Sequence, residues 1–269
     1  MNTSVLDFCL LIPCYNNFNG LIRSLESVTY FSGNYVVLIV DDGSNEPLSL
    51  ERIKNELKEA KPLVVLRNEK NSGITAALNK GLAWISENTN TKYIARLDCS
   101  DICHPERFII QVQYMNDHPG VGLTGSWCQI IDKEISFSYS YKTSVQHDDI
   151  CKEMYYRNVF MHATVMFRAS LLKKSGYYPT NFEYAEDYAF FWMLIKVSQS
   201  FVLDKFLVIC ELNKGGLSYS NKGKQLKARW KVVRAFGKNK LMQSFAFIRL
   251  LLLYILPKEL LLHLKKWKG

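Results

Sequence analysis

Short apolar runs alternate with amphipathic segments through the first half of this chain. The runs are rich in β-branched and aromatic residues and are bounded by turn residues, which predicts strands at Leu6–Ile12, Tyr35–Val40, Leu63–Leu66 and Tyr93–Leu97. The segments between them carry apolar residues at helical spacing and predict helices at Gly20–Thr29, Leu48–Ala60 and Thr75–Ser86. Because alternating strands and helices pack as a mostly parallel sheet flanked by helices, we predict a doubly wound α/β fold.

The second half is less regular after Asp117. It predicts shorter strands at Val121–Thr124 and Val165–Phe167, a helix at Ala185–Val197, and a polar Gly/Ser/Lys loop at Lys214–Lys224. The expected organisation is one catalytic-type domain over residues 1–212, with halves 1–117 and 118–212, followed by a basic helical extension over 213–269.

Charge is distributed unevenly between these parts. The net charge is +9, and the 14 Lys and Arg residues after position 212 face a single acid, Glu259, so the extension carries +13 and the body −4. A basic extension on a mildly acidic body is typical of a segment that docks on an anionic surface. The seven cysteines are scattered without a C-x-x-C pair, which indicates a reducing, cytoplasmic compartment and argues against a zinc site or a disulfide framework.

Polar residues cluster where the predicted strands end. Asp98 and Asp101 follow the fourth strand, Asp41-Asp42-Gly43-Ser44 ends the second, and Asn71-Ser72-Gly73 precedes the third helix. Each cluster taken alone is equally typical of a turn or a helix cap. Together they predict one ligand-binding edge, where paired carboxylates can hold a divalent cation and a helix N-terminus can bind phosphate. No glycine-rich fingerprint or P-loop follows the first strand, which argues against a nicotinamide enzyme or a kinase-like ATP site.

These pieces occur in the order found in one family. They are Ile12-Pro13-Cys14-Tyr15-Asn16, Val40-Asp41-Asp42-Gly43-Ser44, Asn71-Ser72-Gly73 with Ile74–Gly81, Arg96-Leu97-Asp98-Cys99-Ser100-Asp101, His162–Arg168 and Glu186–Trp192. Over about residues 5–212 the chain resembles the family 2 glycosyltransferases, inverting enzymes of the GT-A fold, in particular those of bacterial surface-polysaccharide synthesis.

The resemblance implies a role for individual residues. The nucleotide-sugar-binding residues would be Pro13, Tyr15, Asn16, Asp42, Asn71, Gly73, Arg96 and Asp98, with Asp42 reading the base, commonly uracil. Asp98 lies in the D-x-D motif of the family, whose carboxylates hold Mg²⁺ or Mn²⁺ against the diphosphate. Asp187 would be the general base, with Glu186 and His162 on the acceptor side or behind it.

Two positions depart from the family pattern. Ser100 stands where relatives carry a second metal-binding Asp, and a hydroxyl is a much weaker ligand for these cations. We expect Asp98 and Asp101 to share the metal instead. Glu211 and Asn213 replace the Arg and His of the usual Tyr-Arg-x-His motif.

Alternative interpretations stand beside two of these roles. The Glu186–Asp187 pair is also what the dipole of a helix N-terminus favours, and a single His such as His162 is commonly a buried core residue. No Ser-His-Asp or Cys-His arrangement indicates a covalent nucleophile.

The extension combines apolar stripes with lysines. Leu226, Trp230, Val233 and Phe236 recur at helical spacing, Phe245–Leu256 is strongly apolar around Arg249, and Lys258–Lys268 is amphipathic. No apolar run reaches the ~20 residues that span a bilayer. We therefore expect an interfacial helix on an anionic membrane, the alternative being that these helices cover the domain or a dimer partner. No nucleic-acid-binding motif accompanies the basic residues.

The expected function is transfer of a sugar, with inversion, from a nucleoside-diphosphate sugar (UDP-linked) to a glycan or lipid-linked acceptor. The expected location is cytoplasmic and peripheral on the plasma membrane. One alternative is a non-catalytic sugar-nucleotide binder or scaffold of the same fold. Another is a nucleotidyltransferase, which typically has a glycine-rich basic signature that Pro13–Asn17 does not supply.

Overall fold

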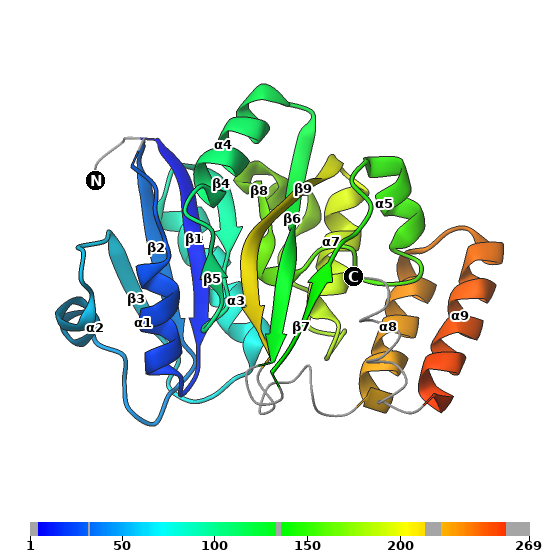
Figure 1. The fold of residues 1–269 in the computed structure, drawn as a ribbon, viewed down its shortest axis with the longest axis horizontal. Helices are drawn as coiled ribbons and strands as arrows, with labels where there is room; N and C mark the ends of the chain where they lie inside the picture. Colours follow the sequence, from blue (N-terminus) through cyan, green and yellow to red (C-terminus); the bar gives the residue numbers. More distant parts are fainter. Residues whose placement is uncertain (1–4, 32, 133–135, 213–221, 257–269) are drawn as a thin grey trace.

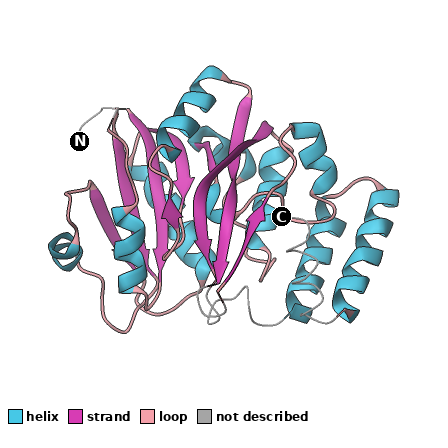
Figure 2. Cartoon of the chain, viewed as in Figure 1, coloured by secondary structure: helices cyan, strands magenta, loops and turns pink. Residues whose placement is uncertain are grey.

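The computed structural model describes residues 5–31, 33–132, 136–212 and 222–256. Within these ranges the strands form one mixed sheet in the order β3-β2-β1-β4-β8-β6-β9-β5, with β7 paired to β6 (Figures 1 and 2). The strands are β1 Leu6–Cys14, β2 Tyr35–Asp41, β3 Leu63–Arg67, β4 Thr91–Arg96, β5 Ile102–Cys103, β6 Val121–Asp132, β7 Phe137–Tyr141, β8 Met166–Arg168 and β9 Gln199–Glu211. The helices are α1 Phe18–Glu26, α2 Leu50–Glu56, α3 Ile74–Asn88, α4 Arg107–Asp117, α5 His147–Glu153, α6 Leu172–Ser175, α7 Glu186–Ile195, α8 Lys222–Phe236 and α9 Lys240–Ile255, with 3₁₀ turns η1 His162–Thr164 and η2 Ala169–Leu171.

The first four strands are parallel, as predicted. β1 lies between β2 and β4, and Leu11 is in register with Leu38 on one side and Arg96 on the other. Alternate residues of β1 enter different layers: Phe8 packs in the same core as α1, α2 and α4, whereas Cys9 packs in the core of α3. Both faces of this half are therefore buried, which explains why its strands read as nearly continuous apolar runs.

The second half of the sheet contains more strand than the sequence pattern predicts. β8 and β6 run antiparallel to β4 and β8 respectively, and β9 then pairs in parallel with β6. The predicted strand Val121–Thr124 is only the start of β6, and β9 was not predicted. Both strands mix polar and apolar residues, and their pairing shifts register near Ser126 and Trp127, so neither shows a simple period of two.

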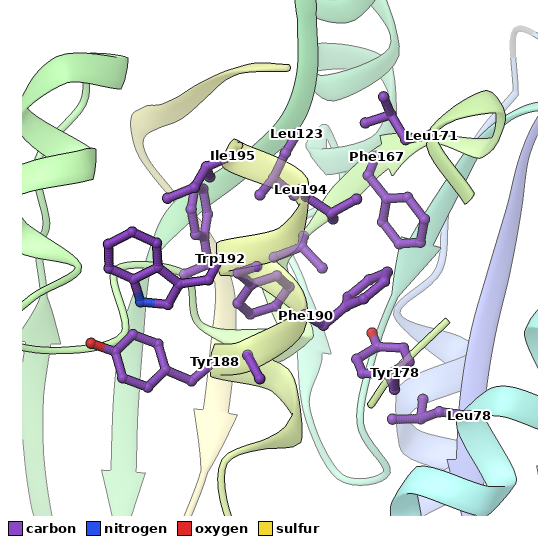
Figure 3. Packing of buried hydrophobic residues seen from close by; sticks show 14 of the residues in the cluster. Leu78, Leu123, Phe167, Leu171, Tyr178, Tyr188, Phe190, Trp192, Leu194 and Ile195 are labelled. Carbon is purple, nitrogen blue, oxygen red and sulfur yellow. The ribbon is translucent and has the colours of Figure 1, made fainter. Parts of the chain in front are cut away.

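α7 supplies much of the core on the α3 side of the sheet. Tyr188, Phe190, Phe191, Trp192 and Leu194 are all buried. Figure 3 shows Tyr188, Phe190 and Trp192 directed toward different neighbours around the helix. Phe190 packs against Tyr178 with a ring-centroid distance of 4.1 Å. A helix apolar on all sides has to be surrounded by other elements, which here include α8.

The extension contributes two of those elements. α8 packs on α7 through the buried residues Val232 and Val233, and α9 packs on α8 with Ala246 and Leu250 buried (Figure 1). Lys222 and Lys224 belong to α8, so the end of the predicted loop Lys214–Lys224 is helical, and residues 214–221 lie outside the described residues. The predicted segment Lys258–Lys268 lies outside the described residues, and the domain boundary at residue 213 stays a prediction.

Candidate functional site

The loop after β1 is tied to the loop after β2. Asn16 has a φ of 49°, its backbone N–H donates to Ser44 Oγ at 2.9 Å, and its side-chain oxygen accepts from the Asn45 N–H at 2.8 Å. Asn is among the residues that adopt positive φ most readily, so this turn suits its sequence. Tyr15 beside it is 46% exposed. The same loops border a cavity of about 340 Å³, lined by Asn16, Asn17, Phe18, Ser44, Asn45, Glu46, Leu48 and Arg52.

The adjacent acids Asp41 and Asp42 have different structural roles. Asp41 is fully buried and accepts hydrogen bonds from the N–H groups of Ser44 and Leu48 and from the Arg67 guanidinium. Burial acts to raise the pKa of Asp41, but these hydrogen bonds outweigh it and lower that pKa below its ordinary value. Asp41 therefore stabilises the turn as a buried carboxylate.

Asp42 holds the loop that leads into α3. Its carboxylate accepts from Asn68 Nδ2 at 2.7 Å and from the N–H groups of Ser72 and Gly73 at 3.0 and 2.9 Å. Gly73 precedes α3 at a φ of 87°, and no atom lies within 4 Å of the position that a Cβ would take. Gly73 itself supplies no side-chain cap to α3, and the exposed residue Asn71 lies just before it. A helix N-terminus of this kind can bind phosphate. The expected contact of Asp42 with a base stays a prediction.

Arg96 lies behind Asp98. Arg96 is fully buried at the end of β4 and donates to the carbonyls of Leu11 and Leu97 and to the carboxylate of Asp98. The side chain of Asp98 is 40% exposed. Partial burial acts to raise the pKa of Asp98, but the charge of Arg96 outweighs it and lowers that pKa, which keeps Asp98 ionised. Arg96 therefore directs a carboxylate toward the edge of the sheet.

His162 completes this arrangement from η1. Its Nε2 lies 3.2 Å from Arg96 Nε and 2.8 Å from the Tyr178 hydroxyl. Burial and the nearby Arg96 charge lower the pKa of His162 to about 3, so the ring is neutral at physiological pH. An unprotonated Nε2 has one lone pair, which can accept from the Arg96 Nε–H or from the Tyr178 hydroxyl. The place of His162 on the acceptor side or behind it stays a prediction.

Ser100 and Asp101 are engaged with the protein. Ser100 has a φ of 84°, and its Oγ accepts from Asn17 Nδ2 at 3.1 Å beside Gly20 of α1. Asp101 is 6% exposed and accepts from the Glu211 N–H of β9 at 2.9 Å. Burial and the charge of Asp98 raise the pKa of Asp101 well above its ordinary value. The two residues fix the D-x-x-D turn against α1 and β9.

Only Asp98 of this motif suits a divalent cation without rearrangement. Among the described residues no group of three or more His, Cys, Asp or Glu side chains is arranged to hold a metal ion. Mg²⁺ is commonly held by one or two carboxylates, with substrate phosphates completing its shell, and Asp98 fits that pattern. The raised pKa and the burial of Asp101 make it a poorer ligand, so sharing of a metal by Asp98 and Asp101 stays a prediction.

The acid pair at the start of α7 forms the other part of the site. Asp187 Oδ2 accepts from Asn158 Nδ2 at 2.9 Å. Partial burial raises the pKa of Asp187, and burial together with the Asp187 charge raises the pKa of Glu186 to about 7. The charge of Arg229 on α8 acts in the opposite direction on Asp187. A carboxylate with a raised pKa is a stronger base, as proton abstraction requires.

The structure places the expected residues in two groups. Pro13, Tyr15, Asn16, Asp42, Asn71, Gly73, Arg96, Asp98 and Asp101 come from the ends of the parallel strands and the loops after them, whereas His162, Glu186 and Asp187 come from η1 and α7. Hydrogen bonds link Asp98 to Arg96 and Arg96 to His162 across the two groups. The residues that sequence analysis missed are Arg67, Asn158 and Tyr178, which act on Asp41, Asp187 and His162. Of these, Arg67 had a signal, because it ends β3 beside Asp41 of β2.

A mixed α/β sheet with a carboxylate turn after β4 and an acid pair at the start of a later helix is the arrangement predicted for an enzyme that binds a nucleotide sugar. Residues 9–176 match Glycosyl transferase family 2, and the chain belongs to this family, which confirms the predicted family.

Two curated proteins show the extent of the sequence similarity. Over 186 residues the chain is 33% identical to the amylovoran biosynthesis glycosyltransferase AmsE of Erwinia amylovora, covering 67% of this chain and 66% of that protein. Over 193 residues it is 30% identical to an uncharacterized glycosyltransferase of Haemophilus influenzae, covering 67% of this chain and 58% of that one. The chain thus spans less than two thirds of the length of either relative.

Solved structures show the same fold. S. aureus TarS 1–349 in complex with UDP-GlcNAc has a TM-score of 0.67 at 17% identity, covering 91% of this chain and 72% of that one. The mannosyltransferase PcManGT from Pyrobaculum calidifontis, in complex with GDP-Man and Mn²⁺, has a TM-score of 0.62 at 14% identity, covering 92% and 69%. These similarities confirm the predicted GT-A fold. Separately, none of the helices in the described ranges has the length and apolar character needed to cross a bilayer.

Proposed function

We propose that this protein transfers a sugar, with inversion, from a UDP-sugar to a glycan or lipid-linked acceptor in the synthesis of a cell-surface polysaccharide. The observation that carries the proposal is the ionised, partly exposed Asp98, held by Arg96 at the carboxyl edge of the sheet. The family match and the amylovoran relative support the reaction class and the surface polysaccharide. Structural neighbours bind UDP-GlcNAc or GDP-Man, so the choice of UDP belongs to the proposal.

The donor would lie along the ends of β1, β2 and β4. Asp42 binds the N–H groups of Ser72 and Gly73, and the first turn of α3 beyond them offers a positive dipole end for a phosphate. A divalent cation, when bound, would neutralise the diphosphate leaving group, and Asp98 would hold it. The structural neighbour with Mn²⁺ supports this cofactor.

Asp187 would take the proton of the acceptor hydroxyl. Its raised pKa makes it a stronger base than an ordinary Asp, and the hydrogen bond from Asn158 holds one of its oxygens in place. Attack from the side opposite the diphosphate inverts the anomeric centre in a single step, so no covalent nucleophile is needed.

The place of reaction belongs to the same proposal. We infer that the protein works in the cytoplasm, on the inner face of the plasma membrane, with anionic lipid as a partner of its basic C-terminal part. The charge of +13 after residue 212 supports this location.

The test of the donor site is calorimetric titration of UDP with and without Mn²⁺. The variants are Asp98→Ala and, as a matched control, Asp7→Ala, which removes a carboxylate that pairs with Lys92 where β1 begins. We expect Mn²⁺ to strengthen UDP binding in the wild type and in Asp7→Ala but not in Asp98→Ala. UDP binding that ignores both Mn²⁺ and Asp98 would refute the role of Asp98.

A non-catalytic sugar-nucleotide binder is the second candidate, and Ser100 favours it. The Ser100 hydroxyl bonds to Asn17 and replaces the acid that relatives use for metal. Complementation of a deletion strain with Asp187→Asn separates the candidates. An enzyme loses the polysaccharide with this variant, whereas a scaffold keeps it.

A further inference from the structure

The two C-terminal helices, α8 and α9, differ in how far their apolar residues are buried. Val232 and Val233 of α8 are 0% and 1% exposed and join the core around α7. α9 packs through one side, on which Ala246 and Leu250 are buried against α8 and the Phe247 ring lies tilted against Trp230, with ring centroids 5.1 Å apart. α9 is therefore the outermost helix of this end of the molecule, as Figure 1 shows.

The opposite side of α9 is apolar and open. Leu241, Phe245, Ile248, Leu252 and Ile255 recur at alternating spacings of four and three residues, which places them on one helical face. These residues are 53–67% exposed. Leu251 lies beside this face and is 49% exposed. Other exposed large apolar residues in the described ranges occur singly or in short loops, so this is the one continuous apolar helix face that the described part of the chain leaves open.

Positive charge lies at the N-terminal end of this face. From Lys222 to Ile255 the chain contains nine Lys and Arg residues and no Asp or Glu. Lys238 and Lys240 are exposed where α9 begins, and Arg249 inside α9 donates to the carbonyl of Tyr156. Folding thus directs the apolar face outward and fixes the internal arginine on the protein side.

An apolar face with lysines at its N-terminal end and no acid in either helix matches one occupant in charge and shape. A protein partner or a second copy would have to supply acidic residues around an apolar groove, whereas the copy itself presents only cations here. An anionic bilayer offers phosphate groups at its surface and hydrocarbon beneath them. A helix of 16 residues is too short to cross the bilayer and suits a position in its plane.

We propose that the face of α9 made by Leu241, Phe245, Ile248, Leu252 and Ile255 seats in the interface of an anionic bilayer. Lys238 and Lys240 lie at the headgroups in this arrangement. The inference deepens the proposed location at a membrane and does not depend on the transfer reaction.

The test is co-sedimentation of the full chain with vesicles of phosphatidylcholine, pure or mixed with phosphatidylglycerol. The variant Phe245→Ser/Ile248→Ser/Leu252→Ser removes the centre of the face. The matched control is Phe31→Ser/Ile109→Ser, which removes apolar residues that are 89% and 45% exposed elsewhere. A charge variant, Lys238→Gln/Lys240→Gln, tests the headgroup contact. Calorimetric UDP binding in the absence of vesicles shows whether each variant keeps its donor site.

We expect the wild type and the control to bind mixed vesicles much more tightly than pure phosphatidylcholine. The triple variant should bind mixed vesicles at least about tenfold more weakly than the wild type. The affinity of the charge variant for mixed vesicles should fall several-fold, mainly at low salt. Each single Ser variant should give a smaller loss, which keeps the test valid where the triple variant folds poorly.

Two outcomes overturn the inference. One is equal vesicle binding by the triple variant and the control. The other is absence of vesicle binding together with self-association that the triple variant abolishes, which would make α9 a dimer interface. A wild-type protein that does not bind UDP would instead count against the proposed function and would not affect the conclusion from the vesicle experiment.

Discussion

Replacing Arg96 by Met tests whether this buried arginine supports the protein or binds the donor. Arg96 has no exposed surface, and its guanidinium bonds to two carbonyl oxygens, to Asp98 and to His162. Met occupies a similar volume and supplies no donor. The substitution therefore removes the charge and its hydrogen bonds while creating little cavity.

The expected cost follows from what is left behind. Removing one partner of a buried ion pair costs about 3–5 kcal/mol. Asp98 is 40% exposed, so water replaces part of the lost cation and favours the lower end, about 3 kcal/mol. The Leu11 carbonyl still accepts a hydrogen bond from the Leu97 N–H at 3.4 Å, which also favours the lower end of this cost. For a chain of this size a loss of 3 kcal/mol lowers the melting temperature by roughly 6–12 °C.

The pH dependence gives the estimate a second check. Arg96 lowers the pKa of Asp98, so the pair stabilises the fold above the ordinary Asp pKa, and this contribution disappears as the pH falls through the lowered value. In Arg96→Met the destabilisation relative to wild type should accordingly shrink toward pH 3.

The assay is urea denaturation at pH 7 and pH 3, with Lys92→Met as control. Lys92 pairs with Asp7 at 3.1 Å and is 47% exposed, so its loss should cost only about 0.2–1 kcal/mol. Equal losses in the two variants would refute the supporting role of Arg96. A stable Arg96→Met protein that no longer binds UDP would instead assign Arg96 to the donor.

Four further predictions concern the acid pair and the Ser100 turn. Asp187→Asn should lower the transfer rate at least about 100-fold with UDP affinity unchanged, and a smaller loss would exclude Asp187 as the base. Because a base acts deprotonated and the pKa of Asp187 is raised, the rate should fall on acidification from a higher pH than an ordinary Asp allows, and Glu186→Gln should remove any titration near pH 7. Asn158→Ala should reduce kcat about tenfold with little change in KM and alter that acidic limb, whereas a merely structural residue would change melting alone. Gly20→Ala should cost about 1–3 kcal/mol in urea denaturation, because its Cβ would collide with Ser100 and Asn17, and an unchanged midpoint would contradict the packing.

The parallel half of the fold was predictable because local pattern and tertiary environment agree there. Tyr35–Val40 is apolar throughout since β2 is covered on both faces, and its predicted limits differ from β2 by one residue. The resemblance then brought Asp98 and Gly73 to one edge, and the structure places both on the ends of parallel strands or their loops. Motif order carried this inference, since each turn alone reads equally well as a cap.

The rest depended on contacts that sequence spacing does not encode. β9 follows α7 and pairs with β6 across an irregular register, so its neighbours are set by tertiary structure. Asn158 reaches Asp187 from 29 positions away and ends no predicted element. The sequence also did not predict which apolar residues of the extension are buried. Val233 and Phe245 are both apolar residues in basic segments, but packing on α7 buries Val233, whereas Phe245 stays exposed.

The burial of α8 on α7 and the exposed face of α9 together link the catalytic proposal to the membrane proposal. α8 packs on α7, the helix that begins with Glu186 and Asp187, and Arg229 of α8 is close enough to lower the pKa of Asp187. α9 packs on the other side of α8 and presents the apolar face. A bilayer that holds α9 therefore holds, through two helix contacts, the residues that would receive the acceptor. A lipid-linked acceptor is anchored in the same surface, so docking through α9 would confine enzyme and acceptor to one plane and raise their encounter rate without any added affinity at the site.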